Sequence, residues 1–243
     1  MAHIPFPHTG YSEDIFRRVR VLFGGQFVAN AETPKLAWER PLFPTYFFRR
    51  ADVKADFLRN PSASVDGATV YDLVVGEKTA QGAVTEFASG PFAGLVKILP
   101  SVPDAWFEEN ERMVWVYPRD PYKRLTFLPS SKHIRVEIDG VEVANSTRFI
   151  RLYETGHAIR TYLPMTDVRL DLLTPSTQTS ICQYKGEASY FDVNLPSGTK
   201  HGYAWWYKSS TAESQSIVGL IAFYDEKLDV WADGVKQDRS KFY

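Results

Sequence analysis

Apolar and polar residues alternate along several short segments of this chain, which is the pattern of strands with one buried face. Residues 134–138 read "IRVEI" and residues 141–143 read "VEV", with an apolar residue at every second position. Asp139 and Gly140 lie between these segments, and an Asp-Gly pair is a strong signal for a two-residue hairpin turn. The pattern therefore predicts a β-hairpin here.

Further runs rich in β-branched and aromatic residues predict more strands. They are "DVRLDLL" (167–173), "ASYFDVNL" (188–195), "YAWWYK" (203–208) and "GLIAFYD" (219–225). Strand alternation places Trp206 on the face opposite to Trp205 and Tyr207. Only the run "STAESQSIV" predicts a short helix, with Ser210 or Thr211 as its N-cap. We therefore expect a mainly β, antiparallel fold with few short helices.

The chain also contains an internal repeat, which decides its organisation. Residues 19–58 align with residues 134–173 without a gap. The identities, numbered in the second copy, are Arg135, Val136, Gly140, Val143, Ala144, Asn145, Glu154, Asp167, Val168, Asp171 and Leu173. Residues 94–106 align with residues 219–231, which pairs Trp106 with Trp231 as expected core residues. The chain is a tandem duplication of one β unit.

A length of 243 residues lets each copy bury its own core. The predicted parts are an N-terminal tail (1–18), a first β domain (19–125) and a second β domain (126–243). The prolines of residues 117–132 disfavour regular structure, so this stretch is the expected linker. His3 and His8 lie in the tail, which we expect to be mobile and too poor a scaffold for a metal.

Composition excludes several classes of function. Lys and Arg total 28 against 29 for Asp and Glu, and no dense basic run is present, so nucleic acid is not an expected partner. No apolar run approaches a membrane span, and the first residues do not resemble a secretion signal, which predicts a soluble cytoplasmic protein. The single cysteine excludes an internal disulfide and a multi-thiolate zinc site. We expect no metal and no cofactor.

The two copies differ mainly in ionisable and hydrogen-bonding residues. The second copy reads "ETGH" at 154–157, whereas the first reads "ERPL" at 39–42. The second copy also has "CQYKG" at 182–186, of which the alignment retains only the glycine. Gly186 and Tyr190 align with Gly67 and Tyr71, so we assign them to architecture. Since turns joining strands gather at one end of a sheet, the two motifs predict a site in the second copy.

The segments "YETGHAIRTYLPMTDVRLDLL", "CQYKGEASYFDV" and "AFY" resemble the domain of unknown function 427 family, which also carries a nucleotidyltransferase-like label. The resemblance implies a β-tent, in which two antiparallel sheets meet at an angle with a pocket between them. The positions that match the family pattern are Glu154, Thr155, Gly156, His157, Asp167, Asp171, Tyr184, Lys185, Gly186, Tyr190 and Trp205. Similar tent domains hold a structural zinc on paired cysteines, which this chain lacks. Neither a Gly-Ser turn followed by an Asp-x-Asp pair nor a phosphate loop is present, so no motif supports the nucleotidyltransferase label.

Three residues are candidates for catalysis, each beside a structural alternative. His157 could act as an acid or base, or be a hydrogen-bonded turn histidine. Lys185 could hold an anionic group, act as an amine nucleophile, or be a solvated surface lysine. Cys182 could be a reactive thiolate or a small buried residue in a strand.

The predicted ligand-binding residues are Glu154, Thr155, His157, Tyr184, Lys185 and Trp205. Asp167 and Asp171 recur in both copies and are assigned to structure. Our leading hypothesis is that the second domain binds a small polar or anionic molecule. The alternatives are an enzyme that uses His157 with Cys182 or Lys185, and a protein-interaction module without pocket chemistry. The sequence leaves the identity of the ligand and the oligomeric state open.

Overall fold

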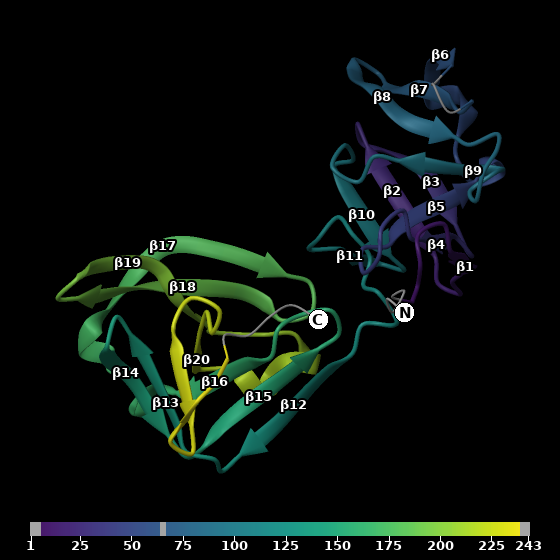
Figure 1. Cartoon of the computed structure of the whole chain (residues 1–243). Coiled ribbons are helices and arrows are strands. Elements are labelled where there is room, and N and C mark those ends of the chain that lie inside the picture. Colours follow the sequence, from purple (N-terminus) through teal and green to yellow (C-terminus); the bar gives the residue numbers. More distant parts are fainter. Residues whose placement is uncertain (1–5, 64–66, 239–243) are drawn as a thin grey trace. The chain divides into compact units, whose positions relative to one another are not determined.

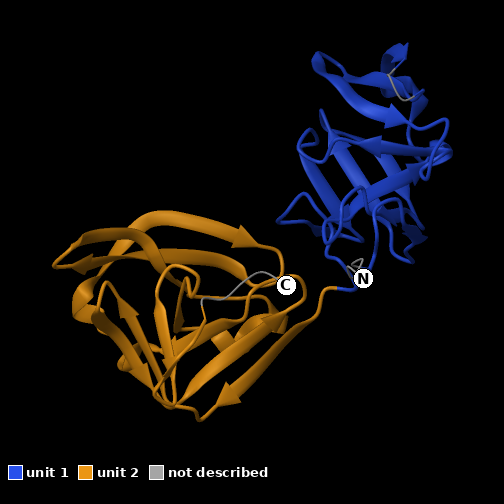
Figure 2. Cartoon of the chain, in the orientation of Figure 1, with its two compact units in different colours: residues 1–122 blue, residues 123–243 orange. Residues whose placement is uncertain are grey.

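The computed structural model describes residues 6–63 and 67–238. The chain divides into two compact units, residues 1–122 and 123–243 (Figure 2). Each unit contains one antiparallel sheet of seven strands and one of four. The expected mainly β fold, with two tandem antiparallel halves and few short helices, is confirmed.

The first unit has the following elements (Figure 1). Its larger sheet runs in the order β1 (Ser12–Asp14), β4 (Lys35–Ala37), β5 (Thr45–Arg49), β9 (Leu95–Ile98), β8 (Lys78–Glu86), β7 (Thr69–Val75) and β6 (Leu58–Ala63). Its smaller sheet runs β11 (Glu111–Arg112), β10 (Ala105–Glu108), β2 (Val19–Phe23) and β3 (Gln26–Ala31). Two 3-10 turns, η1 (Arg50–Asp52) and η2 (Ala55–Phe57), connect β5 to β6, and Val53 between them bridges to Ala29 of the smaller sheet.

The second unit repeats this topology strand for strand. Its larger sheet runs β12 (Leu125–Ser130), β15 (Phe149–Glu154), β16 (Arg160–Pro164), β20 (Leu220–Phe223), β19 (Gly198–Tyr207), β18 (Gly186–Leu195) and β17 (Leu173–Cys182). Its smaller sheet runs β14 (Val141–Ser146), β13 (Ile134–Ile138), β21 (Asp229–Ala232) and β22 (Val235–Lys236). The 3-10 elements are η3 (Met165–Asp167), η4 (Leu170–Leu172) and η5 (Ala212–Ile217).

Strand alternation gives the larger sheet of the second unit two buried faces. The inner core combines residues of both sheets, among them Val136 and Leu163. The outer core lies on the opposite face of the larger sheet and includes Trp205 and Tyr207. Trp206 packs against the inner core, which confirms the alternation predicted for "YAWWYK".

Two local predictions are confirmed. The hairpin of β13 and β14 turns at Asp139 and Gly140, whose φ angles are 50° and 79°. Type I′ turns require a positive φ at both central residues, which explains the Asp-Gly pair. The predicted short helix is η5, which follows Thr211 at the N-cap position.

Three expectations about secondary structure were wrong. The run "DVRLDLL" forms the turns η3 and η4, and only Leu173 belongs to a strand, because a single residue, Val168, bridges to the smaller sheet. Residues 125–130 of the expected linker form β12, an edge strand in which the missing N–H of Pro129 costs no ladder bond. Residues 12–14 of the expected tail form β1, which pairs with β4. His8 is exposed, and His3 lies outside the described residues.

The strand registers also correct the later part of the repeat alignment. Phe191 opposes Ala204 beside a bulge, as Tyr71 opposes Val84, so the counterpart of Tyr71 is Phe191 and not Tyr190. Asp192 Oδ1 accepts the N–H of Gly202 at this bulge, and Asp72 Oδ1 accepts that of Gly82 in the first unit, both at 2.8 Å. A shift of one residue moves a side chain to the other face of the sheet, so Tyr190 is specific to the second unit.

The same one-residue shift applies to Trp106 and Trp231, which are not counterparts in the two units. Trp106 opposes Val21 and is buried, whereas Trp231 opposes Arg135 and is half-buried under its guanidinium at 4.8 Å. The counterpart of Trp231 is Phe107, which opposes Arg20. The assignment of Trp231 to the core was therefore wrong by one position.

Candidate functional site

The turn of residues 182–186 joins β17 to β18 and is held rigidly. Lys185 N donates to Cys182 O at 3.2 Å, which closes the turn. The Tyr184 carbonyl accepts hydrogen bonds from Thr211 Oγ1 at 2.5 Å and from Ser214 Oγ at 2.9 Å. Gly186 has a φ of 104°, and a Cβ there would lie 3.2 Å from Ser209 O. These contacts orient Lys185 toward the end of β15.

Lys185, Glu154 and Lys123 form a buried ionic group at this end of the larger sheet. Lys185 Nζ lies 2.5 Å from Glu154 Oε2, and Lys123 Nζ lies 2.8 Å from Oε1. The side chains are 11%, 3% and 6% exposed, respectively. One carboxylate thus faces two ammonium groups and neutralises only one of them, so one unit of positive charge remains in a poorly solvated place.

The pKa values follow from these contacts. Burial alone would raise the pKa of Glu154, but Lys185 and Lys123 outweigh it and lower this pKa from 4.5 to about 2. Burial opposes the charged form of Lys185, yet Glu154 keeps its pKa above the ordinary value. Both groups are therefore charged at neutral pH.

His157 stands at the edge of this group. Its Nδ1 lies 3.3 Å from Lys123 Nζ and 3.8 Å from Glu154 Oε1. Partial burial and the neighbouring lysines lower the pKa of His157, although Glu154 acts in the opposite direction. The imidazole is therefore mainly neutral at neutral pH.

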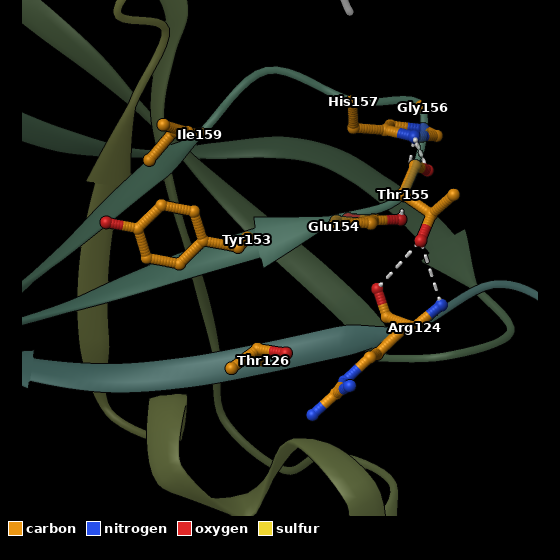
Figure 3. A pocket seen from close by; sticks show the side chains of 8 residues that line it. All are labelled: Arg124, Thr126, Tyr153, Glu154, Thr155, Gly156, His157 and Ile159. Atoms are coloured by element: carbon orange, nitrogen blue, oxygen red, sulfur yellow. Dashed lines mark hydrogen bonds and ion pairs between the residues drawn. The ribbon is translucent and has the colours of Figure 1, made fainter.

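A surface hollow of about 410 Å³ opens beside His157 (Figure 3). Its lining comes from β12 and the residue before it, from the end of β15, and from the turn that follows β15. The lining residues are Arg124, Thr126, Tyr153, Glu154, Thr155, Gly156, His157 and Ile159. Thr155 Oγ1 accepts the N–H of Arg124 at 3.1 Å, which ties the turn to the edge strand. Among the described residues, the Arg124 guanidinium has no hydrogen-bond or ion-pair partner.

The predicted site residues fall into two groups. Glu154, Thr155 and His157 line the hollow, and Lys185 reaches it through its ion pair with Glu154. The remaining three lie outside the lining: Tyr184 and Trp205 are buried, and Cys182 is half-buried at the end of β17. The aromatic wall of the hollow is Tyr153 instead.

Sequence reasoning missed Lys123, Arg124 and Thr126. All three lie in or beside β12, within the stretch interpreted as a linker because of its prolines. The usable signal was the repeat itself, because β12 occupies the position of β1 and pairs with β15 as β1 pairs with β4.

A second ionic group, also missed, lies at the outer core. Arg160 pairs with Glu226, and the Arg160 guanidinium carbon lies 5.6 Å from the centre of the Trp205 ring. The neighbouring Asp225 has its pKa raised from 3.8 to about 7, because burial outweighs the attraction of Arg160 and Arg151. The pKa of this carboxyl group therefore lies close to neutral pH.

In the first unit, Glu39 occupies the position of Glu154. Its partner is Lys97 at 2.7 Å, on β9, and the pair is more exposed than the group in the second unit. The carboxylate is thus common to both units, whereas among the described residues a second, buried cation pairs with it only in the second unit.

The described residues contain no group of three or more His, Cys, Asp or Glu side chains that could hold a metal ion. Within the same residues, no helix has the length and apolarity needed to cross a membrane.

Comparison with known proteins agrees with the repeat. No curated protein is similar enough in sequence to match the chain. The model of the family described as domain of unknown function (DUF427) matches twice, at residues 12–109 and 126–234. The two matched segments fall in the two compact units and cover most of the chain. The protein therefore belongs to the DUF427 family and contains two tandem copies of its domain.

Proposed function

We propose that the second unit binds a small anionic molecule in the hollow beside His157. The observation that carries this proposal is the guanidinium of Arg124, which stands at the hollow without a partner among the described residues. An arginine fork matches the geometry of a carboxylate or a phosphate. The hollow has room for a molecule of this kind.

The buried ionic group supports an anion at the same place. Lys123 and Lys185 together exceed the charge of Glu154 by one unit, and burial reduces the screening of this excess. In this proposal Lys185 does not touch the ligand. It pairs with Glu154, and Glu154 in turn pairs with Lys123, whose ammonium group contacts His157 Nδ1.

His157 supplies a neutral donor. A lysine ammonium can only donate, so a hydrogen bond from Lys123 makes Nδ1 the acceptor and places the ring proton on Nε2. The 3.2 Å separation between Nδ1 and Thr155 O would require the opposite tautomer. We favour the first, because the ammonium group is the stronger donor. The Nε2–H group is then available to donate a hydrogen bond to a ligand in the hollow.

The test is titration of the protein with sodium acetate, phosphate and benzoate at constant ionic strength, followed by the NMR shifts of the Thr155 and Gly156 amides. We expect at least one anion to give saturable shifts that weaken about tenfold or more in Arg124→Gln, since a charge-assisted pair contributes about 1.5–3 kcal/mol. The matched control is Lys132→Gln, which removes an exposed cation from the loop after β12. Equal binding by both variants, or no saturable shift with any anion, would contradict the proposal.

An enzyme that uses Lys185 as a nucleophile has less support. Amine nucleophiles need a neutral lysine, whereas Glu154 raises the pKa of Lys185 and holds it as an ammonium.

A further inference from the structure

In the first unit, the position that corresponds to the hollow is filled by side chains of the same unit. Thr126 opposes Tyr153 across β12 and β15. At the matching register of the first unit, Trp38 N donates to Tyr11 O at 2.9 Å, one residue beyond the pairing of Ser12 with Ala37. Tyr11 is therefore the counterpart of Thr126, and Trp38 is the counterpart of Tyr153.

Trp38 is completely covered in the first unit. The ring of Tyr11 lies 5.6 Å from the Trp38 ring, and the ring of Tyr122 lies at 5.9 Å. The indole N–H of Trp38 donates to the carboxylate of Asp120 at 3.2 Å, and this carboxylate is buried. Tyr122 N donates to the other oxygen of the same carboxylate at 2.9 Å. One short segment thus brings an aromatic ring and a carboxylate together onto Trp38.

The second unit has the same frame with smaller side chains. Threonine replaces the tyrosine at the position of Tyr11, and the Tyr153 side chain is 41% exposed where Trp38 is fully buried. Figure 3 shows the Tyr153 ring between Ile159 and Thr126, with Arg124 at the same opening. By the same register, the counterpart of Arg124 in the first unit is Thr9. At this position the second unit, which has the hollow, carries a cationic side chain, whereas the first unit, where the place is filled, carries a neutral one.

We infer that the ligand of the second unit is an aromatic carboxylate, a molecule with the two groups that the first unit supplies from its own chain. The ring lies against Tyr153 and Ile159, and the carboxylate meets Arg124 and the N–H of His157. This inference rests on the proposed function and narrows the class of anion. Offset or edge-to-face contact with Tyr153 adds to the apolar burial of the ring.

Titration with benzoate, acetate, inorganic phosphate and benzyl alcohol separates the contribution of the aromatic ring to binding from that of the negative charge. We expect benzoate to bind at least about tenfold more tightly than acetate or phosphate, which corresponds to about 1.4 kcal/mol and to burial of roughly 60 Å² of ring surface. Benzyl alcohol, which has the ring without the charge, should bind at least about tenfold more weakly than benzoate. Two variants test where the ring binds. Tyr153→Ala should remove most of the preference for benzoate over acetate. Thr126→Tyr should prevent the binding of both benzoate and acetate, because the tyrosine would fill the hollow as Tyr11 fills the corresponding place in the first unit. Lys132→Gln, which changes an exposed residue outside the lining of the hollow, is the control and should bind like the original protein.

Each contrary result has a distinct meaning. If acetate or phosphate binds as tightly as benzoate, the aromatic class is overturned while anion binding in the hollow stands. If benzyl alcohol equals benzoate, or if no anion binds, both the inference and the proposed function fail. If benzoate binds equally well to Thr126→Tyr, it binds outside the hollow and the inference is overturned.

Discussion

Replacing Glu154 by glutamine should destabilise the second unit strongly. The substitution keeps the shape of the side chain but leaves Lys123 and Lys185 buried without a counter-charge. The fall in the pKa of Glu154 from 4.5 to about 2 corresponds to about 3 kcal/mol at about 1.4 kcal/mol per pKa unit. Removing one partner of a buried ionic group typically costs about 3–5 kcal/mol. We therefore expect Glu154→Gln to lose about 3 kcal/mol or more of unfolding free energy.

The first unit provides the matched control. Glu39 pairs with Lys97 at 2.7 Å, but the two side chains are 32% and 19% exposed, so water screens the pair. We expect Glu39→Gln to cost about 1 kcal/mol or less. The two substitutions remove the same group from equivalent positions and differ in the number and the burial of the cations that remain: two buried lysines around Glu154 and one more exposed lysine beside Glu39.

The assay must resolve the two units, since a chain of two compact units need not unfold in one transition. Amide hydrogen exchange measures the opening free energy of the slowest amides in β13, β15 and β16 against those of the first unit. Glu154→Gln should accelerate exchange only in the second unit, and adding Lys185→Met should restore part of the protection. A loss below about 1 kcal/mol, or a loss equal to that of Glu39→Gln, would refute the reasoning.

The pH dependence has a definite sign. The pKa of Glu154 is lower in the folded protein than in the unfolded chain, so its ionisation stabilises the fold above pH 4.5, and this stabilisation disappears as pH falls toward about 2. Opening free energies of the second unit, measured by the same exchange method across this range, should decline more steeply in the original protein than in Glu154→Gln. Parallel pH curves would contradict this assignment.

Three further predictions concern single positions. Gly186→Ala should cost about 2 kcal/mol or more in urea unfolding, because alanine must adopt a φ of 104° with its Cβ 3.2 Å from Ser209 O; a loss within about 0.5 kcal/mol would show that the turn relaxes freely. His157 should titrate below 6.5 by NMR, and Lys123→Met should raise its pKa, because Lys123 disfavours the imidazolium; an unchanged pKa in that variant would refute the proximity of the ammonium. Asp225→Asn should stabilise the second unit more at pH 8 than at pH 5, since the raised pKa of Asp225 makes its ionisation unfavourable to folding; an equal effect at both pH values would contradict the burial of this carboxyl.

The hairpin and the tandem repeat could be predicted from sequence because their causes are local. Asp139-Gly140 supplies the positive φ angles that a tight turn requires, and alternation assigns Trp205 and Trp206 to opposite faces. The repeat also drew attention to the turn after β15, since Thr155, Gly156 and His157 differ from their first-copy counterparts, and these three residues do line the hollow.

Tertiary structure decided which side chains line the hollow. Residues 125–130 form β12 only because β15 offers a free edge, and this pairing brings Arg124 and Thr126 to the hollow. Trp205 looked like a ligand wall, but the packing of the outer core buries it. Local sequence determines turns and which faces are apolar, whereas edge pairing, bulges and one-residue register shifts depend on contacts between distant segments. The chain alone therefore determined that two tandem, mainly β units exist, and only their folded registers determined which side chains surround the opening.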